Sequence, residues 1–195
     1  KDPMSRTNHL SDSNSSRVVE APVSLGTAIK NPGVFYYVKN DSDPWCETSY
    51  ANLWSGGFAG IYRLDAYPIE QGQDGLFKTV YDPSPRGYTL PASAAYSNCN
   101  TGRFDNKSSF NITGEYDMGY YFNTGTEPST VFFYGAGCRY AVGAVMDIGG
   151  AGYYLSSQCG GLGQGWYFYF TSSRMASTLA TTAKAFSARP VREIQ

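Results

Sequence analysis

Residues 166 to 170 read WYFYF, an unbroken run of five aromatic side chains. Aromatic residues are enriched in β-strands, where successive side chains point to opposite faces. A strand here sends Trp166, Phe168 and Phe170 to one face, and Tyr167 and Tyr169 to the other. The chain has 17 Tyr, 11 Phe and 3 Trp, so most of these rings must lie in the core.

Short apolar segments bounded by Gly, Asn and Pro surround this run at roughly ten-residue spacing, a pattern typical of antiparallel sheet. From residue 108 onward we expect strands at 109–112, 119–122, 130–134, 139–145, 153–156, 166–170 and 186–190. Two further strands are expected at 34–38 and 77–81.

Two short helices are expected in the first half of the chain. Ser24 is a suitable N-cap for a helix that must stop at Asn31, because Pro32 disfavours helical geometry in the residue before it. Ser93 caps a second helix that runs to Tyr96. The predicted fold class is therefore α+β with β dominant.

Composition sets the domain organisation and excludes several kinds of partner. The 195 residues are 42% hydrophobic, enough for one compact domain, which we place at 18–195. Residues 1–17 are rich in Ser, Asn and Asp and are expected to be a disordered tail or linker. A net charge of -1 gives no basic patch for nucleic acid, and no apolar stretch is long enough to span a membrane.

The histidine and cysteine content argues against catalysis and metal binding. His9 is the single histidine and lies in the polar tail, so nucleophiles that need a histidine base, and most zinc sites, are not expected. Cys46, Cys99, Cys138 and Cys159 show no CxxC spacing. They allow three disulfide pairings or four buried thiols, and the sequence does not choose among these. We expect no cofactor.

An ordered set of segments carries a resemblance to a known family. These segments are KNPGVFYYV, WCETSYANLWSG, KTVYDPSPRGYTLPAS, TVFFYGAGCRY, GGAGYYLSSQ, WYFYFTSS and AFSARPVRE. Over residues 22–193 they resemble the C-terminal domain of fimbrillin-like and pilus-tip surface proteins of gut Bacteroidetes, which is related to the Fibrobacter succinogenes major paralogous domain.

The resemblance implies a C-type lectin-like fold with two short helices, short antiparallel strands and long loops. Some relatives are variable proteins whose C-terminal part is diversified by a retroelement. The sequence departs from the family at two positions: Ser84 stands where relatives have Cys in Asp-Pro-Cys-Pro, and Leu155 where many have Trp. The first change puts any inherited disulfide in doubt.

Two segments without core periodicity, 156–165 (SSQCGGLGQG) and 171–185 (TSSRMASTLATTAKA), are expected to be surface loops held by strands. A scaffold of this kind is typical of binding sites. The alternative is an ordinary solvated loop. The candidate ligand-binding residues are Gln158, Leu162, Gln164, Trp166, Arg174 and Met175.

The sequence gives less support to calcium-dependent sugar binding, glycoside hydrolysis or a binding platform of exposed aromatic residues. Glu127-Pro128-Ser129 is similar to the Glu-Pro-Asn of calcium-dependent lectins, but no cluster of oxygen ligands accompanies it. A glycosidase needs two facing carboxylates, and the spacing of Glu115, Asp117 and Asp147 favours no pair. Exposed aromatics, with Trp45, Tyr50, Trp54, Tyr140 and Trp166 as candidates, would provide a binding platform, although the core is the more frequent place for Trp45 and Trp54.

The sequence therefore predicts a noncatalytic, extracellular ligand-binding domain, an adhesin or receptor-recognition module at a cell surface, an appendage tip or a phage virion. Its expected partner is a surface protein or glycan of a host, another bacterium or a phage target. The alternative is a structural pilus subunit that contacts only other subunits.

Overall fold

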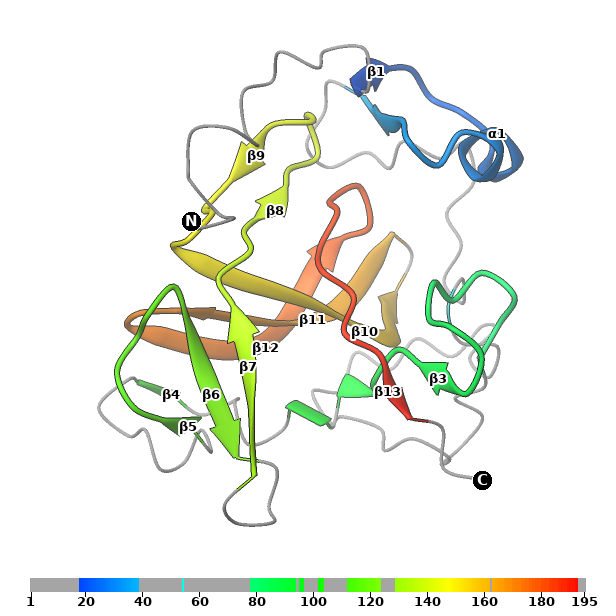
Figure 1. The fold of residues 1–195 in the computed structure, drawn as a ribbon. Coiled ribbons are helices and arrows are strands. Elements are labelled where there is room, and N and C mark those ends of the chain that lie inside the picture. Colours follow the sequence, from blue (N-terminus) through cyan, green and yellow to red (C-terminus); the bar gives the residue numbers. More distant parts are fainter. Residues whose placement is uncertain are drawn as a thin grey trace, which may run out of the picture.

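The computed structural model of this chain describes residues 18–38, 54, 78–93, 95–96, 102–103, 112–123, 129–161 and 163–192, and of 102–103 and 159–161 the backbone alone. Strands are its main regular structure (Figure 1). The described strands form a four-stranded sheet, a three-stranded sheet and three two-stranded pairs. The two larger sheets provide most of the core.

The four-stranded sheet comes mainly from the C-terminal part of the chain. Its order is β10 (Ala151–Gly161), β11 (Gln164–Thr171), β12 (Arg174–Thr181) and β4 (Gly102–Arg103). In its antiparallel register Tyr153 lies opposite Tyr169, and Tyr169 lies opposite Ala176. Because side chains alternate along strands, these three residues share one face, here called the outer face, with Tyr167 and Thr178.

The inner face of the same sheet carries Tyr154, Phe168, Phe170 and Met175, and each is 5% exposed or less. It packs on the antiparallel sheet of β5 (Ile112–Thr113), β6 (Gly119–Asn123) and β7 (Thr130–Tyr134). The ring of Phe168 lies 5.6 Å from that of Phe122. The buried core cluster consists of Tyr96, Ile112, Tyr120, Phe122, Phe133, Tyr154, Phe168, Phe170 and Met175.

Smaller elements surround these sheets. In the N-terminal unit, β1 (Val18–Glu20) pairs in parallel with β2 (Phe35–Tyr37) through helix α1 (Leu25–Lys30). The Ser24 side chain accepts a hydrogen bond from Thr27 N at 3.2 Å, which confirms the predicted cap. The remaining pairs are β8 (Cys138–Arg139) with β9 (Val145–Met146), and β3 (Tyr88–Thr89) with β13 (Val191–Arg192).

The edge of β10 that does not pair with β11 is hydrogen-bonded to chain segments around residues 91, 137 and 187. Ser187 N donates to Tyr153 O, and Leu155 N donates to Ser187 O, both at 2.9 Å. Gly137 N donates to Ala151 O, and Ser157 N donates to Pro91 O, both at 2.8 Å. These bonds satisfy backbone groups that an edge strand would otherwise present to another chain.

The predicted α+β, C-type lectin-like fold is wrong. In the described residues α1 is the single α-helix, and the strands form several small sheets, all antiparallel except the β1–β2 pair. The segment expected as a second helix forms only one 3₁₀ turn, in which Ala95 N donates to Ala92 O at 3.0 Å. A segment of four residues cannot repay the cost of helix nucleation unless tertiary contacts support it.

The expected C-terminal loops are also wrong, because most of 156–165 and 171–185 forms β10, β11 and β12. Their small polar residues show no periodicity, yet cross-strand pairing with the aromatic β11 holds them extended. Residues 79–82 form a turn instead of a strand, and the predicted strand 139–145 is the β8–β9 hairpin. The strands predicted at 119–122, 130–134 and 166–170 are confirmed.

Candidate functional site

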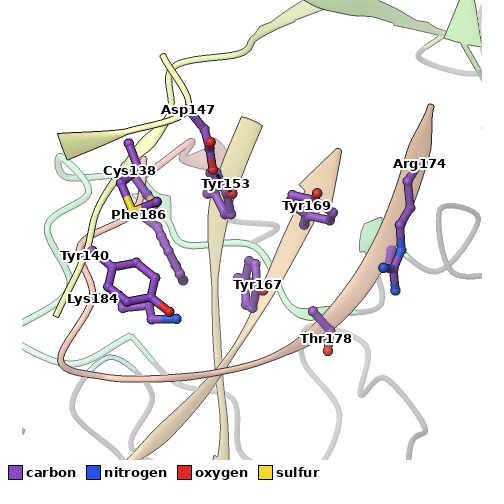
Figure 2. Close-up of a pocket in the computed structure, with 12 residues that line it drawn as sticks. Cys138, Tyr140, Asp147, Tyr153, Tyr167, Tyr169, Arg174, Thr178, Lys184 and Phe186 are labelled. Atoms are coloured by element: carbon purple, nitrogen blue, oxygen red, sulfur yellow. Dashed lines mark hydrogen bonds between the residues drawn. The ribbon is translucent and has the colours of Figure 1, made fainter. Parts of the chain in front are cut away.

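A cleft of about 370 Å³ opens on the outer face of the four-stranded sheet (Figure 2). Three tyrosines on β10 and β11 form its floor, together with two small residues of β12: Tyr153, Tyr167, Tyr169, Ala176 and Thr178. The wall comes from the β8–β9 hairpin and the segment after β12: Cys138, Tyr140, Met146, Asp147, Lys184 and Phe186. Arg174, at the start of β12, completes the lining.

The aromatic rings of the floor contact one another and the ring of Phe186. The Tyr153 and Phe186 rings are stacked, with centroids 5.4 Å apart and planes at 14°. The Tyr167 ring lies 4.6 Å from Phe186, and the Tyr169 ring lies 5.1 Å from Tyr153. Mutual packing of this kind fixes the rings, so a ligand meets a surface that needs little further ordering.

Asp147 anchors one end of the floor. The Tyr153 hydroxyl donates to Asp147 Oδ2 at 2.5 Å. Asp147 has φ 59°, a left-handed conformation that Asp tolerates better than most residues, and its carbonyl accepts from Gly150 N and Ala151 N. Burial, and then the neighbouring Asp147 carboxylate, raise the pKa of Tyr153 well above its ordinary value. Tyr153 is therefore a neutral hydrogen-bond donor at physiological pH.

Two cations lie on either side of the tyrosine row (Figure 2). Lys184 Nζ lies 4.0 Å from the centroid of the Tyr140 ring, a cation–π contact. Arg174 is exposed, and no carboxylate among the described residues forms an ion pair with it. Burial raises the pKa of Tyr167, and the positive charge of Arg174 opposes that rise. Together with Asp147, these two cations give the described lining residues a formal net charge of +1.

The Cys138 thiol forms part of the wall. It is free and 8% exposed. Burial, with a further contribution from the Asp147 charge, raises its pKa to about 11, although Lys184 acts in the opposite direction. The thiolate is therefore scarce at neutral pH, and this sulfur is a poor nucleophile. The side chains of Cys46, Cys99 and Cys159 lie outside the described part of the chain.

Of the five candidate ligand-binding residues that the structure describes, only Arg174 lies in the cleft. Gln164 is exposed on β11 but does not line it. Trp166 is half-buried on the inner-face side, and its Nε1 is buried without a hydrogen-bond partner in the described structure. Leu162 lies outside the described residues.

Two of the candidates are too buried to meet a ligand. Met175 is 1% exposed and belongs to the core cluster. Gln158 is 5% exposed, and its side-chain oxygen accepts a hydrogen bond from the Ser93 hydroxyl. Both lie in segments that the sequence predicts to be loops. Strand alternation turns Met175 inward, whereas Gln158 lies where the β10 register is irregular, between Leu155 and Cys159.

Among the other candidates, Asp147 and Tyr140 line the cleft, while Glu115 and Asp117 do not. Trp54 is half-buried. Trp45, Tyr50 and the Glu127-Pro128 pair lie outside the described residues. In the part of the chain that is described, no three His, Cys, Asp or Glu side chains gather to hold a metal ion, and no helix has the length and apolarity to cross a membrane.

The cleft residues that sequence reasoning missed are chiefly the three floor tyrosines. The alternation in WYFYF and in GYYLSS already assigns Tyr167, Tyr169 and Tyr153 to the face opposite the core phenylalanines. The sequence thus contained the signal for the tyrosines, but no pattern in it shows that Lys184 and Phe186 return to the same face.

No protein-family model, curated protein or solved structure matches this chain.

Proposed function

We propose that this domain is a noncatalytic recognition module whose cleft on the outer face binds a ligand. One observation carries the proposal: three tyrosines from adjacent strands form a concave floor bordered by Asp147, Lys184 and Arg174. Binding sites for small molecules typically combine aromatic walls with a few polar groups, and tyrosine adds contact area at a small cost in conformational entropy.

The protonation states in the cleft support binding over catalysis. General acids, bases and nucleophiles work best when their pKa values lie near the working pH. Here burial moves the pKa values of Tyr153 and Cys138 further from neutrality. Asp147 is the single carboxylate in the described lining, whereas glycoside hydrolysis needs two.

The covered edge of β10 weighs against the alternative of a purely structural pilus subunit. Subunits that assemble by strand addition present an open sheet edge or groove to the next chain. Gly137, Ser187 and Pro91 already bond to backbone groups of Ala151, Tyr153, Leu155 and Ser157, so this part of the β10 edge is not open to another chain.

The extracellular setting of this proposal comes from the sequence resemblance to surface and pilus-tip proteins. In that setting the ligand belongs to the surface of a host cell, another bacterium or a phage target. The binding surface proposed is the sheet face itself, and it replaces the C-terminal loops expected from sequence.

A binding screen with matched variants tests the proposal. The intact domain is applied to panels of glycans and surface proteins beside Tyr167→Ala, which alters the cleft floor, and Tyr121→Ala. Tyr121 is a suitable control because it is 51% exposed on β6 and does not line the cleft. We expect binding that Tyr167→Ala reduces at least tenfold and Tyr121→Ala leaves unchanged, with far-ultraviolet circular dichroism confirming the fold of each variant. Binding that survives Tyr167→Ala would place the site elsewhere.

A further inference from the structure

The chemistry of the cleft lining narrows the class of ligand. The floor offers aromatic surface from Tyr153, Tyr167 and Tyr169, and the described lining residues also include one carboxylate and two cations. The volume, about 370 Å³, lies near the lower end of the range of about 300–1,000 Å³ typical of small-molecule sites. A ligand of one or two sugar rings matches this size, and the C–H face of a pyranose is suited to packing on aromatic rings.

Asp147 adds a requirement for hydroxyl groups. Its Oδ2 accepts from the Tyr153 hydroxyl, and an ionised carboxylate has further acceptor capacity on both oxygens. Asp147 is exposed, so this capacity is open to solvent and to a ligand. A carboxylate attracts the hydroxyl hydrogens of a polyol and repels a densely charged anion such as a polyphosphate.

Arg174 adds a requirement for one negative group. Its guanidinium is not paired with a carboxylate in the described structure, and its planar N–H donors match a carboxylate in a bidentate arrangement. In Figure 2 it lies across the tyrosine row from Lys184 and Tyr140. The described lining residues carry a net positive charge, in contrast to the net charge of -1 of the whole chain.

We infer that the cleft recognises an acidic sugar, with the pyranose ring over the tyrosine floor, its hydroxyls toward Asp147 and its carboxylate toward Arg174. This inference rests on the proposed function, because it names the ligand of the same cleft. Uronic acids of polysaccharides and sialic acids of surface glycans share this chemistry, and the test separates them.

The experiment measures the affinity of the intact domain for two matched pairs by isothermal titration calorimetry: cellobiouronic acid against cellobiose, and sialyllactose against lactose. We expect the acidic member of one pair to bind at least tenfold more tightly, the affinity equivalent of about one charge-assisted hydrogen bond. Raising the salt concentration from 50 to 500 mM should reduce this preference. The pair that shows the preference identifies the source of the sugar.

Two variants test whether Arg174 is the source of the preference for acidic sugars. Arg174→Gln should leave the acidic and neutral sugars binding within about twofold of each other. The control Arg192→Gln should keep the preference, because Arg192 is exposed on β13 and does not line the cleft.

The outcomes separate the two proposals. Equal affinity for acidic and neutral sugars, or binding of a protein that Tyr167→Ala abolishes while neither sugar pair binds, overturns the acidic-sugar inference and leaves the recognition function intact. A preference that persists in Arg174→Gln also overturns it. If no sugar binds and no screened ligand depends on Tyr167, both proposals fail.

Discussion

The two faces of the β10–β12 sheet have similar residues and different environments. The inner face carries Tyr154, Phe168 and Phe170 at 5% exposure or less, whereas Tyr153, Tyr167 and Tyr169 on the outer face are only half-buried. On the inner face Phe168 and Phe170 have no hydroxyl to satisfy, and the hydroxyl of buried Tyr154 donates to Tyr134 O at 2.8 Å. The outer-face rings are all tyrosines, whose hydroxyls can reach water, Asp147 or a ligand. Aromatic residues thus build the core on one face, and on the other they line the cleft for which we propose recognition.

The largest expected effect comes from Phe168→Ala. Phe168 is 0% exposed, stacks on Tyr96 at 4.9 Å and contacts Phe122. Its removal leaves a cavity and should lower the free energy of unfolding by about 3–5 kcal/mol, measured by urea denaturation. The neighbouring outer-face variant, Tyr169→Ala, should lower the free energy of unfolding by only about 1 kcal/mol. Equal losses in the two variants would contradict the division between the faces.

Asp82→Asn tests the loop that supports the far end of β10. The buried Asp82 carboxylate accepts hydrogen bonds from Ser84 N at 2.7 Å, and from Thr89 Oγ1 and Leu90 N at 3.0 Å. Leu90 is followed by Pro91, which bonds to Ser157 of β10. We expect the substitution to lower the free energy of unfolding by about 1–3 kcal/mol.

The same carboxylate should give a pH signature. Burial by itself raises the pKa of Asp82, but the donated hydrogen bonds outweigh it and leave the pKa below its usual value. The folded state therefore favours the ionised form, and this contribution is present above the ordinary carboxyl pKa of 3.8 and is lost as the pH falls through the lowered folded value. Stability measured from pH 7 to pH 2 should fall less steeply in Asp82→Asn. An unchanged slope would argue against this assignment.

Gly152→Ala probes the packing of the inner face. An added Cβ at Gly152 would lie 2.3 Å from the Phe170 ring, so the ring has to move, at a cost of about 1–3 kcal/mol. The matched control is Gly165→Ala on β11, where an added Cβ meets nothing within 4 Å. Thermal unfolding should show a lower midpoint for Gly152→Ala and an equal or higher midpoint for Gly165→Ala. The opposite order would mean that Phe170 is not tightly held.

The last prediction concerns the chemical reactivity of the Cys138 thiol in the cleft wall, and it involves no change in stability. Its pKa of about 11, against an ordinary 9.0, reduces the thiolate at pH 8 by about 100-fold. Iodoacetamide labelling followed by peptide mass spectrometry should therefore modify Cys138 about 100-fold more slowly in the folded protein than in urea. Labelling at similar rates would show that the wall of the cleft is open to solvent.

Local sequence predicted the elements whose signal is local. Ser24 and Pro32 set the ends of α1, and the aromatic runs predicted β7 and much of β6 and β11. Of the five predicted site residues that the structure describes, only Arg174 lies in the cleft. The lack of periodicity in their segments predicts a ligand-facing position for Gln158 and Met175, but both are buried because of tertiary contacts that local periodicity does not report.

By itself, the sequence determined a β-rich chain with alternating aromatic strands, because steric preference and the two-residue repeat of a strand act between neighbours. Only the tertiary structure decided which face became the core and which became a cleft. That choice depends on contacts between distant segments: β6 and β7 cover the inner face, while Asp147, Lys184 and Phe186 border the outer one. Such contacts form only when the whole chain folds, and no local pattern encodes them.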